Sequence, residues 1–328
     1  MTDKRPACIA CGSPTAALID AIWDDRYGAP GIYSVVRCAS CDQMSTIPPL
    51  TEADLPALYS TYYPRRDVNY QDIDAEAAAV ARPMAGFRRW LAGTDNQGHY
   101  SAKAGDRVLD IGSGSCVSLL ELQRMGNKAW GIETDPNVAA IAAHFGLNVH
   151  IGSIHDTPFP GESFDLITLN QVIEHIPEPL SLLSAIHPRL MNEGRVILAF
   201  PNGRSLYRRI FGGRWINWHI PYHQHFYNKQ SFKLLASKAG FEVAEVRTVT
   251  PNLWTAIQLR MLGPPPPVGT PAKEWSSNNA SEDTPKRRSS AIIRVLARVV
   301  TLGFALLNRV VDAIGVGDSL IVTLRKKP

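Results

Sequence analysis

The chain has 328 residues, which is enough to bury a full hydrophobic core and to form more than one unit. Its hydrophobic content of 45%, charged content of 20% and net charge of +4 are ordinary for a globular protein and give no sign of general nucleic-acid binding. The first residues lack the apolar core of a secretory signal, and no uncharged apolar run reaches the ~18–20 residues that span a bilayer. We therefore expect a cytoplasmic protein with reduced cysteines.

Four of the five cysteines fall into two C-x-x-C pairs near the start of the chain. Cys8 and Cys11 form the first pair, Cys38 and Cys41 form the second, and 26 residues separate the pairs. Two such pairs supply the four thiolates of a closed tetrahedral zinc site. The alternatives are reduced core cysteines and a redox C-x-x-C. We favour a zinc ribbon over residues 1–49, with a structural zinc because no coordination position stays open.

Residues 50–104 show apolar positions at helical spacing, followed by a polar stretch, and predict a helical connector. Strand and helix signals then alternate through residues 105–262. The predicted strands are 108–111, 129–132, 149–151, 164–170, 195–200 and 241–249, and the predicted helices are 117–125, 137–145, 179–190 and 231–239. This alternation predicts a parallel sheet covered by helices on both faces, with its ligand at the carboxyl ends of the strands.

The stretch 108–116, VLDIGSGSC, is the most informative part of this core. Gly112 and Gly114 allow backbone to approach a ligand closely, and the helix start behind them offers free N–H groups. Asp110 would repel a pyrophosphate but suits an amino-bearing ligand. Glu133, 19 residues after Gly114, ends the next strand, where an acid can accept hydrogen bonds from both ribose hydroxyls. Nicotinamide cofactors use the same geometry, but the third glycine of G-x-G-x-x-G is missing.

Four stretches in order, VLDIGSGSC, GIETD, HDTPFPGESFDLITLNQVIEHIPEP and GRVILAFPN, resemble the class I S-adenosylmethionine-dependent methyltransferases of the small-molecule type. The resemblance implies that Asp110 and the glycine backbone hold the amino-acid part of the cofactor. It places Glu133 at the ribose, and Asp156 at the adenine. One departure is Cys116, because the family usually has glycine there. The implied cofactor-binding residues are Asp110, Gly112, Ser113, Gly114, Glu133, Thr134, Asp156, Asn170 and Gln171.

Methyl transfer to a hydroxyl or an acidic carbon needs a base, and histidine is the natural candidate near neutral pH. His175 follows the fourth strand, and His223 and His225 lie in the loop after the fifth strand. These three are the candidate catalytic residues. Some relatives bind a metal through E-x-x-E-H and a later histidine, but Gln171 stands at the first position here, so no active-site metal is expected.

The C-terminal part departs from this pattern. Residues 263–289 are rich in Pro, Ser, Asn and charge, which predicts a flexible insertion containing the basic run 286–288. Residues 291–314 form an amphipathic helix with a wide apolar side. Its predicted partner is an anionic membrane surface, a second copy in a homodimer, or the body of the protein itself. Residues 318–325 resemble the family's seventh strand, which lies antiparallel beside strand five.

The sequence thus predicts an α/β fold: a Rossmann-like, seven-stranded, mostly parallel sheet with an antiparallel seventh strand, an N-terminal zinc ribbon and a C-terminal amphipathic helix. The expected units are 1–49, 50–104, 105–262, 263–289, 290–315 and 316–328. The expected activity is methylation of a small molecule, such as a sugar, glycolipid or secondary-metabolite intermediate, with S-adenosylmethionine as cofactor and zinc in the ribbon. The alternatives are an NAD(P)-dependent oxidoreductase and a non-catalytic binding module. We expect no nucleic-acid partner, and a cytoplasmic or peripheral inner-membrane location.

Overall fold

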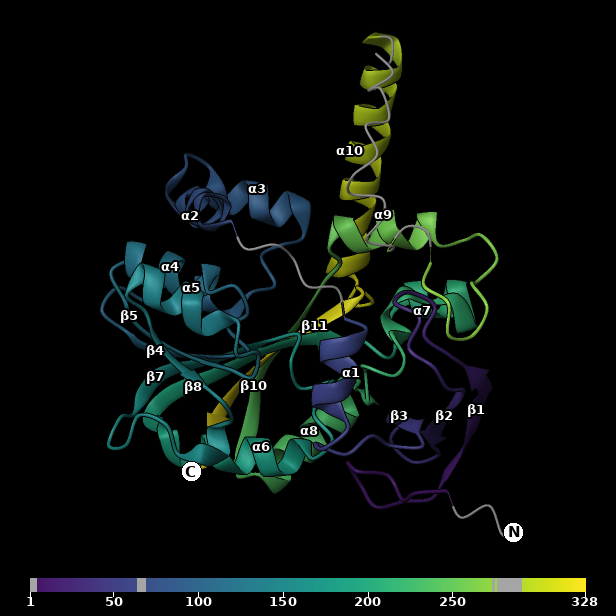
Figure 1. Cartoon of the computed structure of the whole chain (residues 1–328), viewed down its shortest axis with the longest axis horizontal. Coiled ribbons are helices and arrows are strands. Elements are labelled where there is room, and N and C mark those ends of the chain that lie inside the picture. The colour runs from purple at the N-terminus through teal and green to yellow at the C-terminus, as the bar shows by residue number, and fades with distance from the viewer. Residues whose placement is uncertain (1–4, 64–68, 273–274, 276–290) are drawn as a thin grey trace.

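The computed structural model describes residues 5–63, 69–272, 275 and 291–328, and the side chains of 291–301 are not described. Most of the predicted insertion 263–289, including the basic run 286–288, lies outside these residues. Within the described part, two sheets and the helices around them make up the molecule (Figure 1).

The larger sheet has seven strands in the order β10-β11-β8-β7-β4-β5-β6. Strands β4 to β8 run parallel to one another, whereas β11 pairs antiparallel with both β8 and β10. This confirms the predicted fold class, including an antiparallel last strand beside the fifth. The strands are β4 (Arg107–Ile111), β5 (Lys128–Glu133), β6 (Asn148–Ile151), β7 (Phe164–Asn170), β8 (Leu190–Pro201), β10 (Phe241–Val249) and β11 (Ser319–Lys326).

Helices cover both faces of this sheet, which is why its central strands are near-continuous apolar runs (Figure 1). One face carries α4 (Val117–Arg124) and α5 (Val138–Phe145), with α2 (Tyr70–Ala77) packed over α4. The opposite face carries α6 (Pro179–Ile186) and α8 (Lys229–Lys238). Each face has its own apolar cluster, so the sheet is buried on both sides.

The smaller sheet contains the segments between and after the two cysteine pairs. Its strands are β1 (Thr15–Ile22), β2 (Tyr33–Cys38), β3 (Met44–Ile47) and β9 (His225–Phe226), in that order and antiparallel. The fourth strand was not predicted from the sequence, and it comes from the loop after β8. Met44 pairs with Phe226 and Ser45 with His225, so the ribbon shares a sheet with a loop of the larger α/β unit.

The remaining helices are α1 (Leu55–Thr61), α3 (Ala85–Ala92), α7 (Leu206–Phe211), α9 (Asn252–Arg260) and α10 (Ala291–Ala313). Helices α7 and α9 were not predicted. Helix α10 projects from the body beside α9, and α3 lies near its base (Figure 1). Among the residues that the structure describes, no helix combines the length and the apolar character needed to cross a membrane.

Replacing Phe226 tests the packing at the junction between the two sheets. Its ring is 0% exposed and packs among Met44, Trp215 and Trp218. We expect Phe226→Ala to lower the free energy of unfolding in urea by about 3–5 kcal/mol, the usual cost of removing a buried aromatic ring. Phe87→Ala, at a ring that is 52% exposed, is the control and should cost much less. Equal losses in the two variants would contradict a packed junction.

Candidate functional site

The carboxyl ends of four neighbouring strands carry the acidic and amide residues singled out in the sequence. Asp110 lies in β4, Glu133 ends β5, and Asn170 ends β7. Asp156 follows β6 in a short 3-10 turn. Because β7, β4, β5 and β6 are adjacent and parallel, all four residues come to one edge of the sheet.

The turn after β4 depends on left-handed backbone. Gly112 has φ +77°, and a Cβ added there would come within 2.4 Å of Val172, so no other residue fits without rearrangement. Cys116 also has a positive φ, 63°, which costs a non-glycine residue roughly 1–2 kcal/mol. This explains why glycine is expected at that position. Burial raises the pKa of the Cys116 thiol to about 11, so the thiol is protonated at neutral pH and is not a nucleophile.

Asp110 is 5% exposed and lies near the end of β4, just before the turn. Its carboxylate accepts hydrogen bonds from the Ser118 hydroxyl and, at 2.7 Å, from the Thr168 hydroxyl. Burial raises the pKa of Asp110 even though both hydroxyl contacts act in the opposite direction. A cationic group placed beside this carboxylate would therefore be strongly favoured.

Glu133 is fixed by backbone amides. One carboxylate oxygen accepts the N–H of Gly114 at 2.8 Å, and the other accepts the N–H groups of Thr134 and Asp135 at 2.7 and 3.1 Å. The side chain therefore ties the glycine turn to the loop after β5. Thr134 itself is exposed at the surface of that loop.

Asp156 lies further out on the same edge. Its carboxylate accepts the Ser153 N–H at 2.7 Å and pairs with His150 Nε2 at 2.9 Å. The hydrogen bond with His150 is the main reason that the pKa of Asp156 is lowered. About half of the side chain, 51%, is exposed, so a ligand reaching the end of β6 would meet it.

A cleft of about 450 Å³ opens over the glycine turn, a size typical of small-molecule sites. Asp110, Gly112, Ser113 and Gly114 form one wall. The other wall comes from the helical connector, which the sequence analysis treated only as a linking segment. That wall includes Glu76, Arg82, Ala85, Arg88, Arg89, His99 and Tyr100. Three arginines within eight residues were the signal that could have identified it.

Two side-chain amides beside the cleft each have a buried atom without a hydrogen-bond partner among the described residues. Asn170 lines the cleft, and its Oδ1 is buried without a hydrogen bond to the described residues, as is Nε2 of the neighbouring Gln171. A buried polar atom without a partner costs about 1–3 kcal/mol. These two amides therefore fit a site whose remaining hydrogen bonds come from a bound molecule.

The connector wall is braced by a buried pair. His99 Nε2 lies 2.7 Å from Glu121, and the Tyr100 hydroxyl donates to the same carboxylate at 3.2 Å. Arg89 stacks over the Tyr100 ring at 3.9 Å from its centre. Of the histidines in the described part of the chain, only His99 lines this cleft, and sequence reasoning missed it.

Two of the three candidate histidines, His175 and His223, lie in a second cluster next to the same strand ends. The rings of His175 and His223 are 4.6 Å apart, and that of His219 lies 4.9 Å from His223. Backbone hydrogen bonds explain why these histidines lie together, because the N–H groups of Gln224 and His225 donate to the Glu174 carbonyl at 2.8 and 3.2 Å. These bonds hold the loop after β8 against the residues that follow β7.

The proton position on His223 follows from the carbonyl group beside it. His223 Nδ1 lies 2.8 Å from the Asn217 carbonyl, and His175 Nδ1 lies 3.1 Å from that of Tyr222. A carbonyl accepts only, so we assign the proton of His223 to Nδ1 and leave its Nε2 as an acceptor. His175 Nδ1 also contacts the Tyr59 hydroxyl at 2.8 Å, and this hydroxyl can donate to the nitrogen or accept from it. Burial lowers the pKa of His175 to about 4 and that of His223 well below its ordinary value, so both rings are neutral at pH 7.

Glu174 completes the cluster. It is 0% exposed, and neither carboxylate oxygen has a hydrogen-bond partner among the described residues. Burial raises the pKa of Glu174 to about 8. Ligand atoms of Glu174, His175 and His223 all lie within 4.8 Å of one another. Such a group is able to exchange a proton near neutral pH, and it also has the donor set for a divalent cation.

His225 is not part of this cluster. It belongs to β9, where its ring contacts the Ser45 hydroxyl at 3.1 Å and the Pro177 carbonyl at 3.2 Å. Burial lowers the pKa of His225 to about 4. The structure therefore brings His175 and His223 together and places His225 at the junction with the ribbon.

The cysteines of the two C-x-x-C pairs converge as predicted, and we call them the four-cysteine cluster. Cys11 Sγ lies 3.5 Å from the sulfurs of both Cys38 and Cys41, and Cys8 Sγ lies 3.6 Å from Cys41. These separations are far longer than a disulfide bond of ~2.05 Å. They are close to the ~3.8 Å edge of a tetrahedron with zinc–sulfur bonds of ~2.3 Å. The donor set and its geometry thus fit a zinc ion.

The chain is similar in sequence to two known proteins with the same name. The chain is 28% identical over 113 residues to a ubiquinone biosynthesis O-methyltransferase of Nitrosococcus oceani, which covers 32% of this chain and 47% of the relative. It is 26% identical over 163 residues to the protein of the same name from Cupriavidus pinatubonensis, covering 45% and 65%. The chain thus spans about half the length of the first of these relatives.

A solved structure of an S-adenosylmethionine-dependent methyltransferase from Mesorhizobium loti aligns with a TM-score of 0.45 and 13% identity, covering 74% of this chain and all of that one. The family model described as a methyltransferase domain matches residues 83–246. That match covers half of the chain and includes the glycine turn, the four strand ends and Glu174. The chain therefore belongs to the family of methyltransferase domains.

Proposed function

We propose that this chain transfers the methyl group of S-adenosylmethionine to a small-molecule acceptor. The observation that carries the proposal is the buried Asp110 carboxylate in the wall of a 450 Å³ cleft at the carboxyl edge of the sheet. A pyrophosphate at this turn would be repelled by that carboxylate, which argues against a nicotinamide-dependent oxidoreductase. An amino group would be attracted to it.

The residues present fit this cofactor, which supplies an activated methyl group on a sulfonium. Asp110 and the backbone of the glycine turn would hold its amino-acid part, with Arg82 and Arg89 of the opposite wall available to the carboxylate. Glu133 and Thr134 would meet the ribose, and Asp156 the adenine. Asn170 and Gln171 would use their unpaired amide atoms near the methyl-donor end.

The acceptor class is inferred from the names of the relatives. The two curated relatives are named as O-methyltransferases, which favours a hydroxyl as the group that is methylated. Within that chemistry we propose a sugar, glycolipid or secondary-metabolite intermediate. A hydroxyl loses its proton during methylation, so the site needs a group that accepts it.

We assign the proton acceptor to the cluster of Glu174, His175 and His223. Both rings are neutral at pH 7, with Nε2 of His223 assigned as an acceptor, and Glu174 titrates close to that pH. Glu174 lies within 4.8 Å of both rings, and its carboxylate form would stabilise a proton taken up by an imidazole. Because the pKa of Glu174 is about 8, that form is the minor one at pH 7 and becomes more abundant as the pH rises. His225 would support the loop that carries His223, since it bridges Ser45 and Pro177.

The four-cysteine cluster is proposed to hold a structural zinc. Its thiolates would fill the coordination sphere, so the ion takes no part in chemistry. Its role would be to hold the two C-x-x-C turns together, and thereby β2 and β3, which pair with β9 of the core.

Binding of the cofactor product tests the cleft. S-adenosylhomocysteine should bind the purified chain in calorimetry, whereas NAD should not. We expect Asp110→Ala to weaken that binding at least about tenfold, because a charge-assisted contact worth roughly 1.5–3 kcal/mol is lost. Asp165→Asn is the matched control, because Asp165 lies at the amino end of β7 and accepts the Arg107 N–H. Tight NAD binding, or equal affinities for both variants, would sink the proposal.

Metal analysis tests the ribbon. We expect about one zinc per chain, because only the four-cysteine cluster offers a closed thiolate site. Cys41→Ser should lose the zinc and unfold more readily, while Cys116→Ser, which changes the cysteine outside the cluster, should retain it. A second equivalent of metal that disappears in His223→Asn would show that the Glu174 cluster is a metal site, contrary to its assignment as a proton acceptor.

The raised pKa of Glu174 predicts a pH dependence of stability. The folded pKa, about 8, lies above the ordinary value of 4.5, so the wild-type chain should lose stability as pH rises between these values. Glu174→Gln lacks this group and should gain relative to wild type over that range, by up to about 4–5 kcal/mol. It should also lose turnover while still binding S-adenosylhomocysteine.

The measurement is urea unfolding at pH 5 and pH 8.5, with the exposed Glu242→Gln as control. Parallel pH profiles for wild type and Glu174→Gln would show that Glu174 does not titrate in this range. Unchanged turnover in Glu174→Gln would remove it from the proton path.

A further inference from the structure

Helix α10 is oriented with its polar side chains inward and its aliphatic side chains outward. Over its described part, Asn308 is 0% exposed and Arg309 is 8% exposed. In contrast, Leu306, Leu307 and Val310 are 50, 51 and 59% exposed. This is the reverse of a surface helix that packs its apolar stripe on the protein core.

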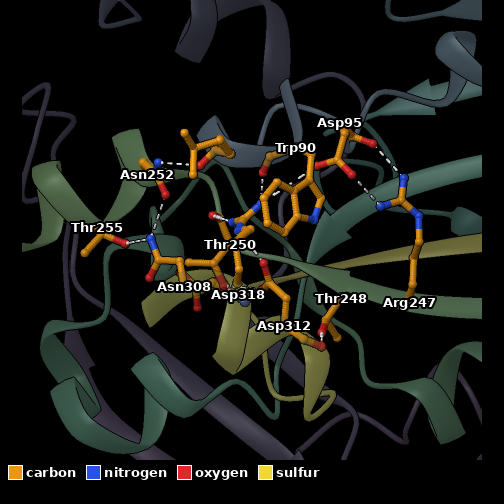
Figure 2. A network of polar contacts seen from close by, with 12 residues as sticks. Trp90, Asp95, Arg247, Thr248, Thr250, Asn252, Thr255, Asn308, Asp312 and Asp318 are labelled. Atoms are coloured by element: carbon orange, nitrogen blue, oxygen red, sulfur yellow. Dashed lines mark hydrogen bonds and ion pairs between the residues drawn. The ribbon is translucent and has the colours of Figure 1, made fainter. Parts of the chain in front are cut away.

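A network of polar contacts holds the helix in this orientation (Figure 2). Asn308 Nδ2 donates to Asn252 and Thr255 of α9 at 2.9 and 3.0 Å. Arg309 donates to the carbonyls of Trp90 and Thr250, each at 2.5 Å, and pairs with Asp312 at 2.9 Å. Turning the helix to bury its leucines would break all of these contacts, so the outward apolar face is fixed.

The helices next to α10 also expose large apolar side chains. Helices α3 and α9 both pack against α10, and each adds large exposed side chains of its own. We call this surface the apolar platform. Its members, all at least 37% exposed, are Met84, Phe87 and Trp90 near or in α3, Leu253, Leu259 and Leu262 in or after α9, and Leu302, Phe304, Leu306, Leu307 and Val310 in α10.

The exposed charged side chains described on these three helices are all basic. Helix α3 contributes the exposed Arg88 and α9 contributes the exposed Arg260, while neither helix contains an acidic residue. The one acid in α10 is Asp312, which is drawn inward by Arg309 and Thr250. Exposed apolar side chains on three helices that pack together, with two exposed arginines, an aromatic Trp90 and no outward acid among the described residues of these helices, complement a lipid surface that is negatively charged.

We propose that the apolar platform docks this protein on the surface of an anionic lipid bilayer. Leucines and the Trp90 ring enter the boundary between headgroups and acyl chains, and the exposed Arg88 and Arg260 contact lipid phosphates. The contact is peripheral, because none of the helices within the described chain is able to span a bilayer. The proposal is independent of the methyl-transfer function, since it concerns a different surface.

Flotation of the full-length chain with vesicles tests the proposal. Vesicles of phosphatidylcholine with phosphatidylglycerol should carry the chain to the top of the gradient, and vesicles of phosphatidylcholine alone should carry much less. Leu306→Glu combined with Val310→Glu should reduce the partition coefficient at least about tenfold, because two aliphatic anchors become charged. Raising the salt concentration should weaken binding to the anionic vesicles.

Leu234→Glu is the matched control, since Leu234 is 38% exposed on α8, on the opposite side of the sheet from α10 (Figure 1). It should float like the wild type. Thermal unfolding should give the same Tm for all three chains, which separates loss of docking from loss of folding.

Two outcomes would overturn the proposal. One is a wild-type chain that stays with the buffer in the presence of anionic vesicles. The other is a wild-type chain that is a dimer in solution, fails to float, and becomes monomeric in the Leu306→Glu/Val310→Glu variant. The second result would assign the apolar platform to a second copy of the chain.

Discussion

The insertion of β11 between β8 and β10 is the constraint on which the C-terminal half of the molecule depends. Residues of β11 pair with both neighbours along nearly their whole length, and Leu320, Val322 and Leu324 are buried in the core. The chain between β10 and β11 must therefore leave the sheet and return to it. Helix α10 ends at this return point, where Thr248 and Thr250 at the end of β10 bond to Asp312 (Figure 2). Closing the sheet thus fixes the base of the projecting helix.

The sheet itself was predictable because each strand carries its own signal. Runs such as FDLITLN and RVILAF are apolar throughout, as strands buried on both faces must be, and their parallel order brings Asp110, Glu133 and Asn170 to one edge. The histidine cluster was only half predictable. His175 and His223 are far apart in the chain, and they meet because the Glu174 carbonyl accepts the N–H groups of Gln224 and His225. No local pattern encodes such a long-range contact.

The same limit applies to the junction between ribbon and core. Two residues, His225 and Phe226, form β9, and a strand of that length has no periodicity to recognise. Its pairing with β3 nevertheless makes the ribbon an extension of the core loop that carries His223. The proposed zinc and the proposed proton acceptor are therefore linked through one short strand. Loss of the proposed zinc would disturb the loop after β8 even though its proposed role is structural and not chemical.

Helix α3 joins the two proposed sites of the molecule. Ala85, Arg88 and Arg89 line the cleft over the glycine turn, while Phe87 and Trp90 belong to the exposed apolar platform. A helix of eight residues cannot move on one side without moving on the other. Contact of the apolar platform with lipid would therefore fix the wall of the cleft, and its arginines, at the membrane surface. A lipid-linked acceptor would then reach the cleft from the bilayer, which is the physical reason to favour a glycolipid among the proposed acceptor classes.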